Sequence, residues 1–124
     1  MKLVSLALVS LLFACSSSTP AFTVGTTTAG PYTFDVLREG DAPAAGVTTT
    51  MVLKATAGGM PTSITGWIGV ASGEGSTKVL AIYDAADGDF DDDVTVPTPM
   101  PAGAKYYFEV TTNSAVVTGS IDLK

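Results

Sequence analysis

The stretch Pro31-Tyr32-Thr33-Phe34-Asp35-Val36-Leu37-Arg38 decides the fold class of this chain. Its apolar residues Tyr32, Phe34 and Val36 occupy alternate positions, and polar residues lie between them. Successive side chains of a β-strand point to opposite faces, so a period of two predicts a strand with one buried face and one solvated face.

The same alternation recurs along the rest of the chain after Gly30, without the 3.6-residue period of a helix. Turn residues separate the alternating segments at regular intervals, and Asp87-Gly88 is a strong hairpin signal. Seven strands in one domain of residues 31–124 therefore predict an all-β, antiparallel β-sandwich. The expected strands are residues 31–38, 47–54, 64–71, 78–84, 90–96, 105–112 and 115–121.

Two features make the expected sandwich immunoglobulin-like. Trp67 lies in the middle of the third strand, where such domains bury a tryptophan between their sheets. Residues 100–106, followed by Phe108 and Val110, resemble the tyrosine corner that leads into the sixth strand. In that motif we expect Tyr106 to point inward and to bond the backbone of the preceding loop through its hydroxyl.

The N-terminus has the pattern of a secretion signal. Met1-Lys2 is followed by the almost wholly apolar residues 3–14, which are too few for a spanning helix of about 20 residues. Leu12-Phe13-Ala14-Cys15 resembles the bacterial lipobox, and Cys15 is the only cysteine of the chain. We therefore expect residues 1–14 to be removed and Cys15 to carry the lipid anchor. The alternative is a plain secretory signal with a chance cysteine at its cleavage point.

The lipobox resemblance also implies a location. Lipoproteins of this type carry three acyl chains, such as palmitate, on the modified cysteine, and two or more chains hold a protein stably on a membrane. Ser16, rather than an aspartate, follows the cysteine, and the sorting rule for such proteins then favours the outer membrane. Residues 15–30 are small, polar and punctuated by glycine and proline, so we expect a flexible tether with a short strand around Phe22 and Val24 as the alternative.

Charge and composition restrict the function. The chain has 12 acidic and 6 basic residues, and loss of residues 1–14 removes one lysine and leaves a net charge of −7. Such a charge disfavours nucleic acid and anionic membrane surfaces as partners. The chain has no histidine, no Gly-x-Ser-x-Gly elbow and no phosphate-binding glycine loop, so we expect no enzymatic activity. A small envelope enzyme remains as an alternative, and it would require converging carboxylates of perturbed pKa.

Five short motifs follow one another along the chain: Gly30-Pro31-Tyr32, Gly66-Trp67-Ile68-Gly69, residues 90–96, Pro99-Met100-Pro101-Ala102-Gly103 and residues 106–110. Their order resembles the YtkA-like and FixH-like immunoglobulin-like domains of bacterial envelopes over most of residues 30–123. This resemblance implies a periplasmic β-sandwich with a binding or accessory role. Some of those domains carry Met/His pairs suited to copper, but no histidine accompanies Met51, Met60 and Met100, so no copper site is predicted.

The clearest candidate for a functional site is residues 84–93, which hold six of the twelve acidic residues of the chain. Clustered carboxylates repel one another, and a hard cation such as calcium relieves that repulsion. Asp87, Asp89 and Asp91 match positions one, three and five of a calcium loop. The match ends there, because Asp92 replaces the glycine at position six and Thr98 replaces the glutamate at position twelve. The second interpretation is a solvated hairpin whose charges keep an edge strand from pairing with other chains.

Together these patterns predict a lipid-anchored envelope protein with a non-catalytic β-sandwich that binds or scaffolds an envelope protein or ligand. The main alternative is a calcium-dependent binding module that uses residues 84–93.

Overall fold

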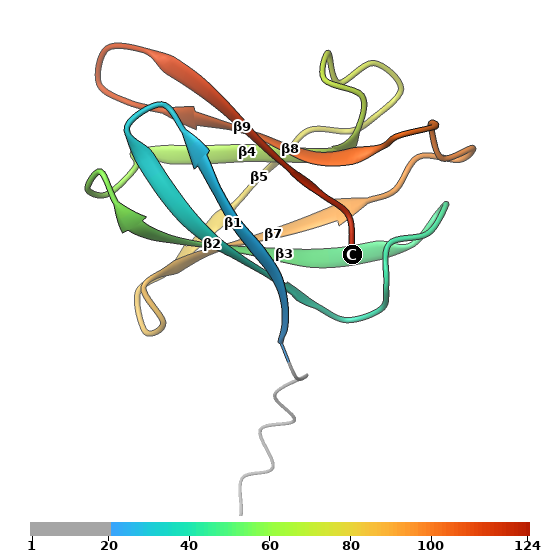
Figure 1. The fold of residues 1–124 in the computed structure, drawn as a ribbon, viewed down its shortest axis with the longest axis horizontal. Helices are drawn as coiled ribbons and strands as arrows, with labels where there is room; N and C mark the ends of the chain where they lie inside the picture. Colours follow the sequence, from blue (N-terminus) through green and yellow to red (C-terminus); the bar gives the residue numbers. More distant parts are fainter. Residues whose placement is uncertain (1–20) are drawn as a thin grey trace, which may run out of the picture.

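The computed structural model describes residues 21–124, which form two antiparallel sheets packed face to face (Figure 1). The predicted signal peptide and Cys15 lie outside the described residues. Within the described residues, no helix is long and apolar enough to cross a membrane. The predicted all-β sandwich is confirmed.

The strand order is that of an immunoglobulin-like domain. In that fold, strands A-B-E-D face strands C-F-G. Here β2-β3-β7-β6 form the first set and β4-β8-β9 form the second, while β1 extends the first sheet beyond β2 and β5 extends the second sheet beyond β4. The first sheet contains β1 (Phe22–Ala29), β2 (Tyr32–Glu39), β3 (Thr48–Ala57), β7 (Asp89–Thr95) and β6 (Ile82–Asp84). The second contains β5 (Val79–Leu80), β4 (Ser63–Gly69), β8 (Lys105–Thr111) and β9 (Val116–Asp122).

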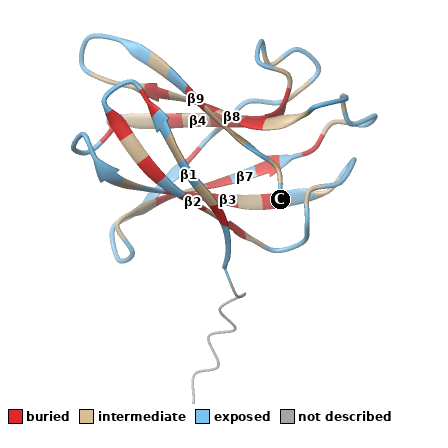
Figure 2. Ribbon diagram, in the orientation of Figure 1, coloured by how far each residue is buried: buried red, intermediate tan, exposed pale blue. Residues whose placement is uncertain are grey.

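The alternating residues form the core between the two sheets, where the buried residues gather in Figure 2. Phe34 of β2 and Phe108 of β8 are fully buried and meet edge to face, with ring centroids 5.3 Å apart. Such aromatic pairs add about 1 kcal/mol beyond the burial of their area. Six of the seven predicted strands are present, with ends that differ from the prediction by at most three residues.

The predicted tether is wrong from Phe22 onward, because residues 22–29 form β1, which pairs with β2. This strand also closes one side of the sandwich against β9, since the hydroxyl of Thr27 donates a hydrogen bond to the carbonyl of Ser120 at 2.7 Å. Threonine and small residues dominate β1, so its sequence resembles a linker, although Val24 is buried. The domain therefore begins at β1 and not at residue 31.

The strand predicted at residues 78–84 is two short strands that belong to different sheets. β5 pairs with β4, and β6 pairs with β7. The chain crosses from one sheet to the other at Ala81, whose N–H donates to the carbonyl of Ile64 at 2.8 Å. An apolar run of this kind predicts extended backbone, but the sheet that each half joins depends on the packing of the whole sandwich.

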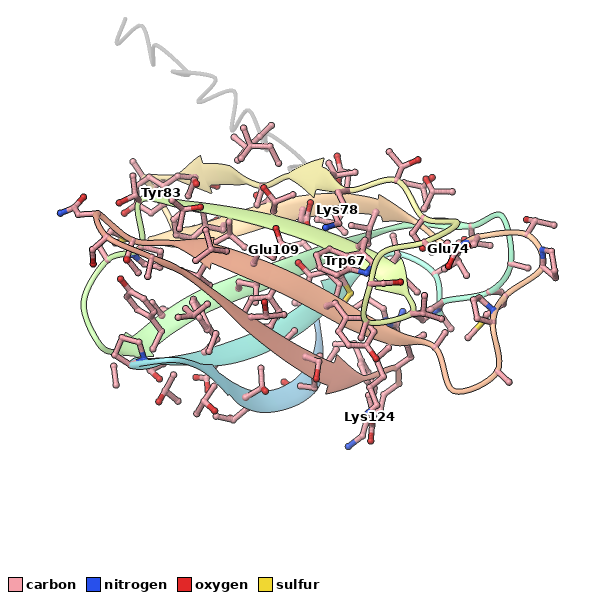
Figure 3. The ribbon with its side chains drawn as sticks, turned by 90° about the horizontal axis from the view of Figure 1, so that it is seen from above. Trp67, Glu74, Lys78, Tyr83, Glu109 and Lys124 are labelled. Carbon is pink, nitrogen blue, oxygen red and sulfur yellow. The ribbon has the colours of Figure 1, made fainter. Side chains whose placement is uncertain are left out.

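The predicted position of Trp67 between the sheets is wrong. Trp67 is buried, but it lies on the outer face of β4, beside its register partner Tyr107, with which it stacks at 5.8 Å (Figure 3). Its indole N–H donates to the carbonyl of Val70 at 2.8 Å, and the amine of Lys78 lies 4.4 Å from the ring centroid. The connection that follows β4 therefore covers the ring outside the sandwich, in place of the facing first sheet.

Candidate functional site

The acidic residues gather at the hairpin that joins β6 to β7. The N–H of Gly88 donates to the carbonyl of Asp84 at 2.7 Å, and Gly88 has a φ of 71°, a value that favours glycine. The carboxylate of Asp84 also accepts a hydrogen bond from the N–H of Ala86 at 2.9 Å. Aspartate and glycine therefore shape this tight turn, in agreement with the hairpin predicted at Asp87-Gly88.

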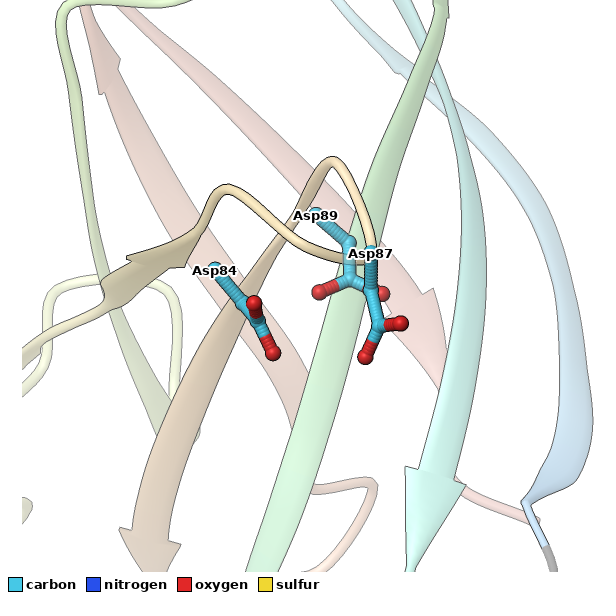
Figure 4. Close-up of side chains that lie close together, drawn as sticks. All are labelled: Asp84, Asp87 and Asp89. Atoms are coloured by element: carbon cyan, nitrogen blue, oxygen red, sulfur yellow. The ribbon is translucent and has the colours of Figure 1, made fainter.

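One carboxylate oxygen from each of Asp84, Asp87 and Asp89 lies within 4.8 Å of the others (Figure 4). Two of these residues belong to the predicted calcium set of Asp87, Asp89 and Asp91. The third residue of the observed cluster is Asp84 and not the predicted Asp91. The β6–β7 register places Asp84 opposite Asp89, whereas Asp91 lies opposite Ile82. The linear calcium-loop pattern missed Asp84, which reaches the cluster through strand pairing.

The local electrostatics show that these acids crowd one another. Partial burial, followed by repulsion from Asp91, Asp87 and Asp84, raises the pKa of Asp89 to about 6. Partial burial, followed by repulsion from Asp84, also raises the pKa of Asp91. The Oδ1 atom of Asp89 is buried and has no hydrogen-bond partner among the described residues. A calcium ion takes six to eight oxygen ligands, so these carboxylates would supply part of its shell and water or carbonyl groups the rest.

Asp92 is separate from this cluster and lies inside the sandwich. It is fully buried, and its Oδ2 accepts a hydrogen bond from the hydroxyl of Tyr106 at 2.7 Å. The predicted inward orientation of Tyr106 is confirmed, but the predicted bond from its hydroxyl to the preceding loop is wrong. Burial raises the pKa of Asp92 to about 7, although the hydrogen bond from Tyr106 lowers it. The period of two that places Phe90 and Val94 inward also identifies Asp92 as an inward residue.

Next to the acidic hairpin lies a short apolar segment, residues 80–83, which we call the β5–β6 edge and in which only Ala81 is buried. The side chains of Leu80, Ile82 and Tyr83 are 63%, 73% and 45% exposed. Tyr83 contacts the buried ring of Phe90 at a centroid distance of 5.1 Å, so the edge is anchored to the core. The sequence predicted residues 78–84 as one strand and not this exposed edge, because apolar composition does not show which residues have a neighbouring strand.

Comparisons of this chain with protein-family models, with curated proteins and with solved structures found no match. The described residues enclose no pocket.

Proposed function

We propose that this chain is a lipid-anchored protein of the bacterial cell envelope, held on the outer membrane through Cys15, and that its β-sandwich is a non-catalytic binding domain. The lipobox at residues 12–15 and the signal pattern of residues 1–14 support the anchor. β1 begins at Phe22, only seven residues after Cys15. An extended chain spans at most about 3.5 Å per residue, so the domain would stay within roughly 25 Å of the lipid surface.

The observation that carries the binding role is the exposure of apolar side chains on the β5–β6 edge. A sheet edge with exposed apolar residues is a template for pairing with another chain, and soluble proteins usually protect such edges. Leu80 and Ile82 are among the most exposed large apolar residues of the described domain. A partner that covers them would remove this surface from water.

Two experiments in whole cells test this function. The variant Cys15→Ser should move the protein from the membrane fraction to the soluble fraction, and its retention in the membrane would contradict the anchor. A photo-crosslinking residue at position 82 should give a discrete cross-linked species with an envelope component. The matched control is the same residue at Val116, which is 60% exposed on β9. Equal cross-linking from both positions, or none from position 82, would contradict a binding role for this edge.

A second candidate function is calcium-dependent binding, and the convergence of Asp84, Asp87 and Asp89 favours it. Calcium would relieve the repulsion that raises the pKa of Asp89 and would release protons as it binds near pH 6. The ion would also order the hairpin beside the β5–β6 edge. Calcium would then regulate the shape and charge of the binding surface.

Calorimetric titration with calcium tests this second candidate. Saturable heat that is lost in the double variant Asp87→Asn, Asp89→Asn and kept in Asp41→Asn would support the site, because Asp41 is an exposed acid outside the cluster. A ligand present at a hundred times its dissociation constant stabilises the fold by about 2.7 kcal/mol, so thermal melting gives an independent readout. A flat titration with an unchanged melting temperature would rule calcium out.

A further inference from the structure

We infer that the β5–β6 edge accepts an extended segment of another protein as an additional strand, and that this segment alternates apolar and basic side chains. The inference rests on the proposed binding function and specifies the partner's chemistry. The inference rests on one continuous piece of chain that forms an outer edge of both sheets. Exposed apolar residues lie in the middle of this piece, and the acidic hairpin lies at its end.

The backbone of this edge is available for pairing. β5 is the last strand of one sheet and β6 is the last strand of the other, so within the described residues neither has a strand on its outer side. Figure 3 shows this segment running along one side of the sandwich between the labelled Lys78 and Tyr83. The opposite side differs, because β1 packs against β9 there. A strand that adds to a sheet edge gains main-chain hydrogen bonds, and its alternate side chains contact the edge.

The side chains determine the apolar part of the partner. Leu80 and Ile82 project into solvent from the two halves of the edge, and Tyr83 is half exposed beside them. Full burial of a leucine or isoleucine side chain is worth about 1.5–3 kcal/mol, so apolar residues of a paired strand would gain affinity here. Short strand length is one way in which natural edges avoid pairing, but here the short strands carry large apolar side chains and therefore attract a partner.

The charges determine the basic part of the partner. No side-chain ion pair involves Asp84, Asp87, Asp89 or Asp91 within the described part of the chain, where the two pairs formed join Lys78 to Glu109 and Lys105 to Asp122. Lysine or arginine side chains of a docked strand would therefore meet carboxylates that have no cation of their own.

A second copy of this chain fits the edge poorly. The mature chain would bring a net charge of −7 and its own acidic hairpin, and the nearest lysine, Lys78, is already paired with Glu109 at 3.0 Å. Like charges that meet at an interface oppose association. The charge distribution thus selects a basic partner over self-association.

Fluorescence anisotropy with labelled synthetic peptides tests the inference on the lipidated mature protein in detergent micelles. The probe is a short peptide that alternates lysine and valine. One control replaces each lysine by glutamate, and another carries N-methyl groups on the amides of one edge, which prevents strand pairing but keeps the charge. We expect saturable binding of the probe and at least tenfold weaker binding of both controls.

Matched protein variants locate the site. Leu80→Ser combined with Ile82→Ser should weaken binding of the probe at least tenfold, whereas Val116→Ser on β9 should leave it unchanged. Equal binding of the N-methylated peptide would overturn strand addition, and equal binding of the glutamate peptide would overturn the charge argument. A dimer of the protein that the double variant dissociates would identify a second copy as the occupant and would also overturn the inference.

Cross-linking and peptide binding together separate failure of this inference from failure of the proposed function. Cross-linking from position 82 without any peptide binding would keep the binding domain and reject this partner chemistry. Absence of both would reject the two together.

Discussion

At the residue scale, Asp92 is the least expected feature of the core. Its carboxyl group lies between the sheets with one oxygen bonded to Tyr106 and the other without a partner in the described structure. A buried carboxylate without a cation is costly, and the group responds by binding a proton more tightly. Its folded pKa of about 7 lies well above the ordinary value of 3.8 for an aspartate, so the folded state holds this proton through a pH range in which the unfolded state has lost it.

We predict that Asp92→Asn stabilises the domain at pH 8. The asparagine stays neutral, and its carbonyl still accepts the hydrogen bond from Tyr106. Between pH 4 and pH 7 the wild-type protein should lose roughly 2–4 kcal/mol of stability as Asp92 ionises, and the variant should lose less. Urea denaturation at pH 4, pH 7 and pH 8 measures both effects. Equal pH dependence in the two proteins would show that Asp92 does not titrate in this range.

Gly66 makes the Asp92–Tyr106 contact geometrically feasible. A Cβ atom at Gly66 would overlap the carboxylate of Asp92 and the hydroxyl of Tyr106. We predict that Gly66→Ala destabilises the domain by about 1–3 kcal/mol through overpacking. The control is the same substitution in an Asp92→Ala background, where it should cost less because part of the overlap is gone. An identical loss of stability in both backgrounds would show that the strain does not come from the contact with Asp92.

At the element scale, β1 shows how a linker-like sequence becomes a strand. Its hydrogen-bond ladder comes from β2, and its inner side contacts β9, where a side chain at Gly119 would overlap the ring of Phe108 and approach the carbonyl of Thr28. Tertiary packing therefore determines the state of this element more than its own β-propensity does.

We predict that a chain shortened to residues 31–124 is less stable than one containing residues 21–124 by at least about 3 kcal/mol. The shorter chain loses the buried side chains of Val24 and Ala29 and exposes the edge of β2. Chemical denaturation of the two proteins measures the difference, and aggregation of the shorter chain would be a second sign of the exposed edge. Equal stability of the two chains would show that β1 does not stabilise the domain, as expected of a tether.

At the scale of the whole molecule, the acidic charge makes stability depend on pH and salt. The pKa values of Asp89, Asp91 and Asp92 are all raised in the folded state. Each therefore binds a proton more tightly when folded, and stability is complete below the unfolded pKa near 4 and is lost as the pH rises through the folded values. Asp89 and Asp91, which are only partly buried, should also respond to ionic strength, because salt screens charges that remain in contact with solvent.

We predict that the melting temperature of the wild-type protein falls between pH 4 and pH 7 and that 0.5 M sodium chloride recovers part of the loss at pH 7. Differential scanning calorimetry across this range measures both effects. The variant Asp89→Asn should reduce the salt effect, whereas Asp41→Asn, which alters an exposed acid outside the cluster and outside both ion pairs of the described residues, should not. A melting temperature that rises with pH would contradict the raised pKa values.

The sequence alone determined the fold class, because the period of two at residues such as Tyr32, Phe34 and Val36 is a local property of a half-buried strand. It also predicted the turn at Asp87-Gly88, because aspartate and glycine favour turns through the conformation and hydrogen bonds of the adjacent backbone. The lipobox at Cys15 is likewise local, and it remains a prediction from the sequence.

Only the tertiary structure decided which strands become neighbours. It placed Asp84 with Asp87 and Asp89, divided residues 78–84 between two sheets, and moved Trp67 to the outer face. The physical reason is that pairing between distant strands follows from burying all apolar faces together, and no single segment carries that information.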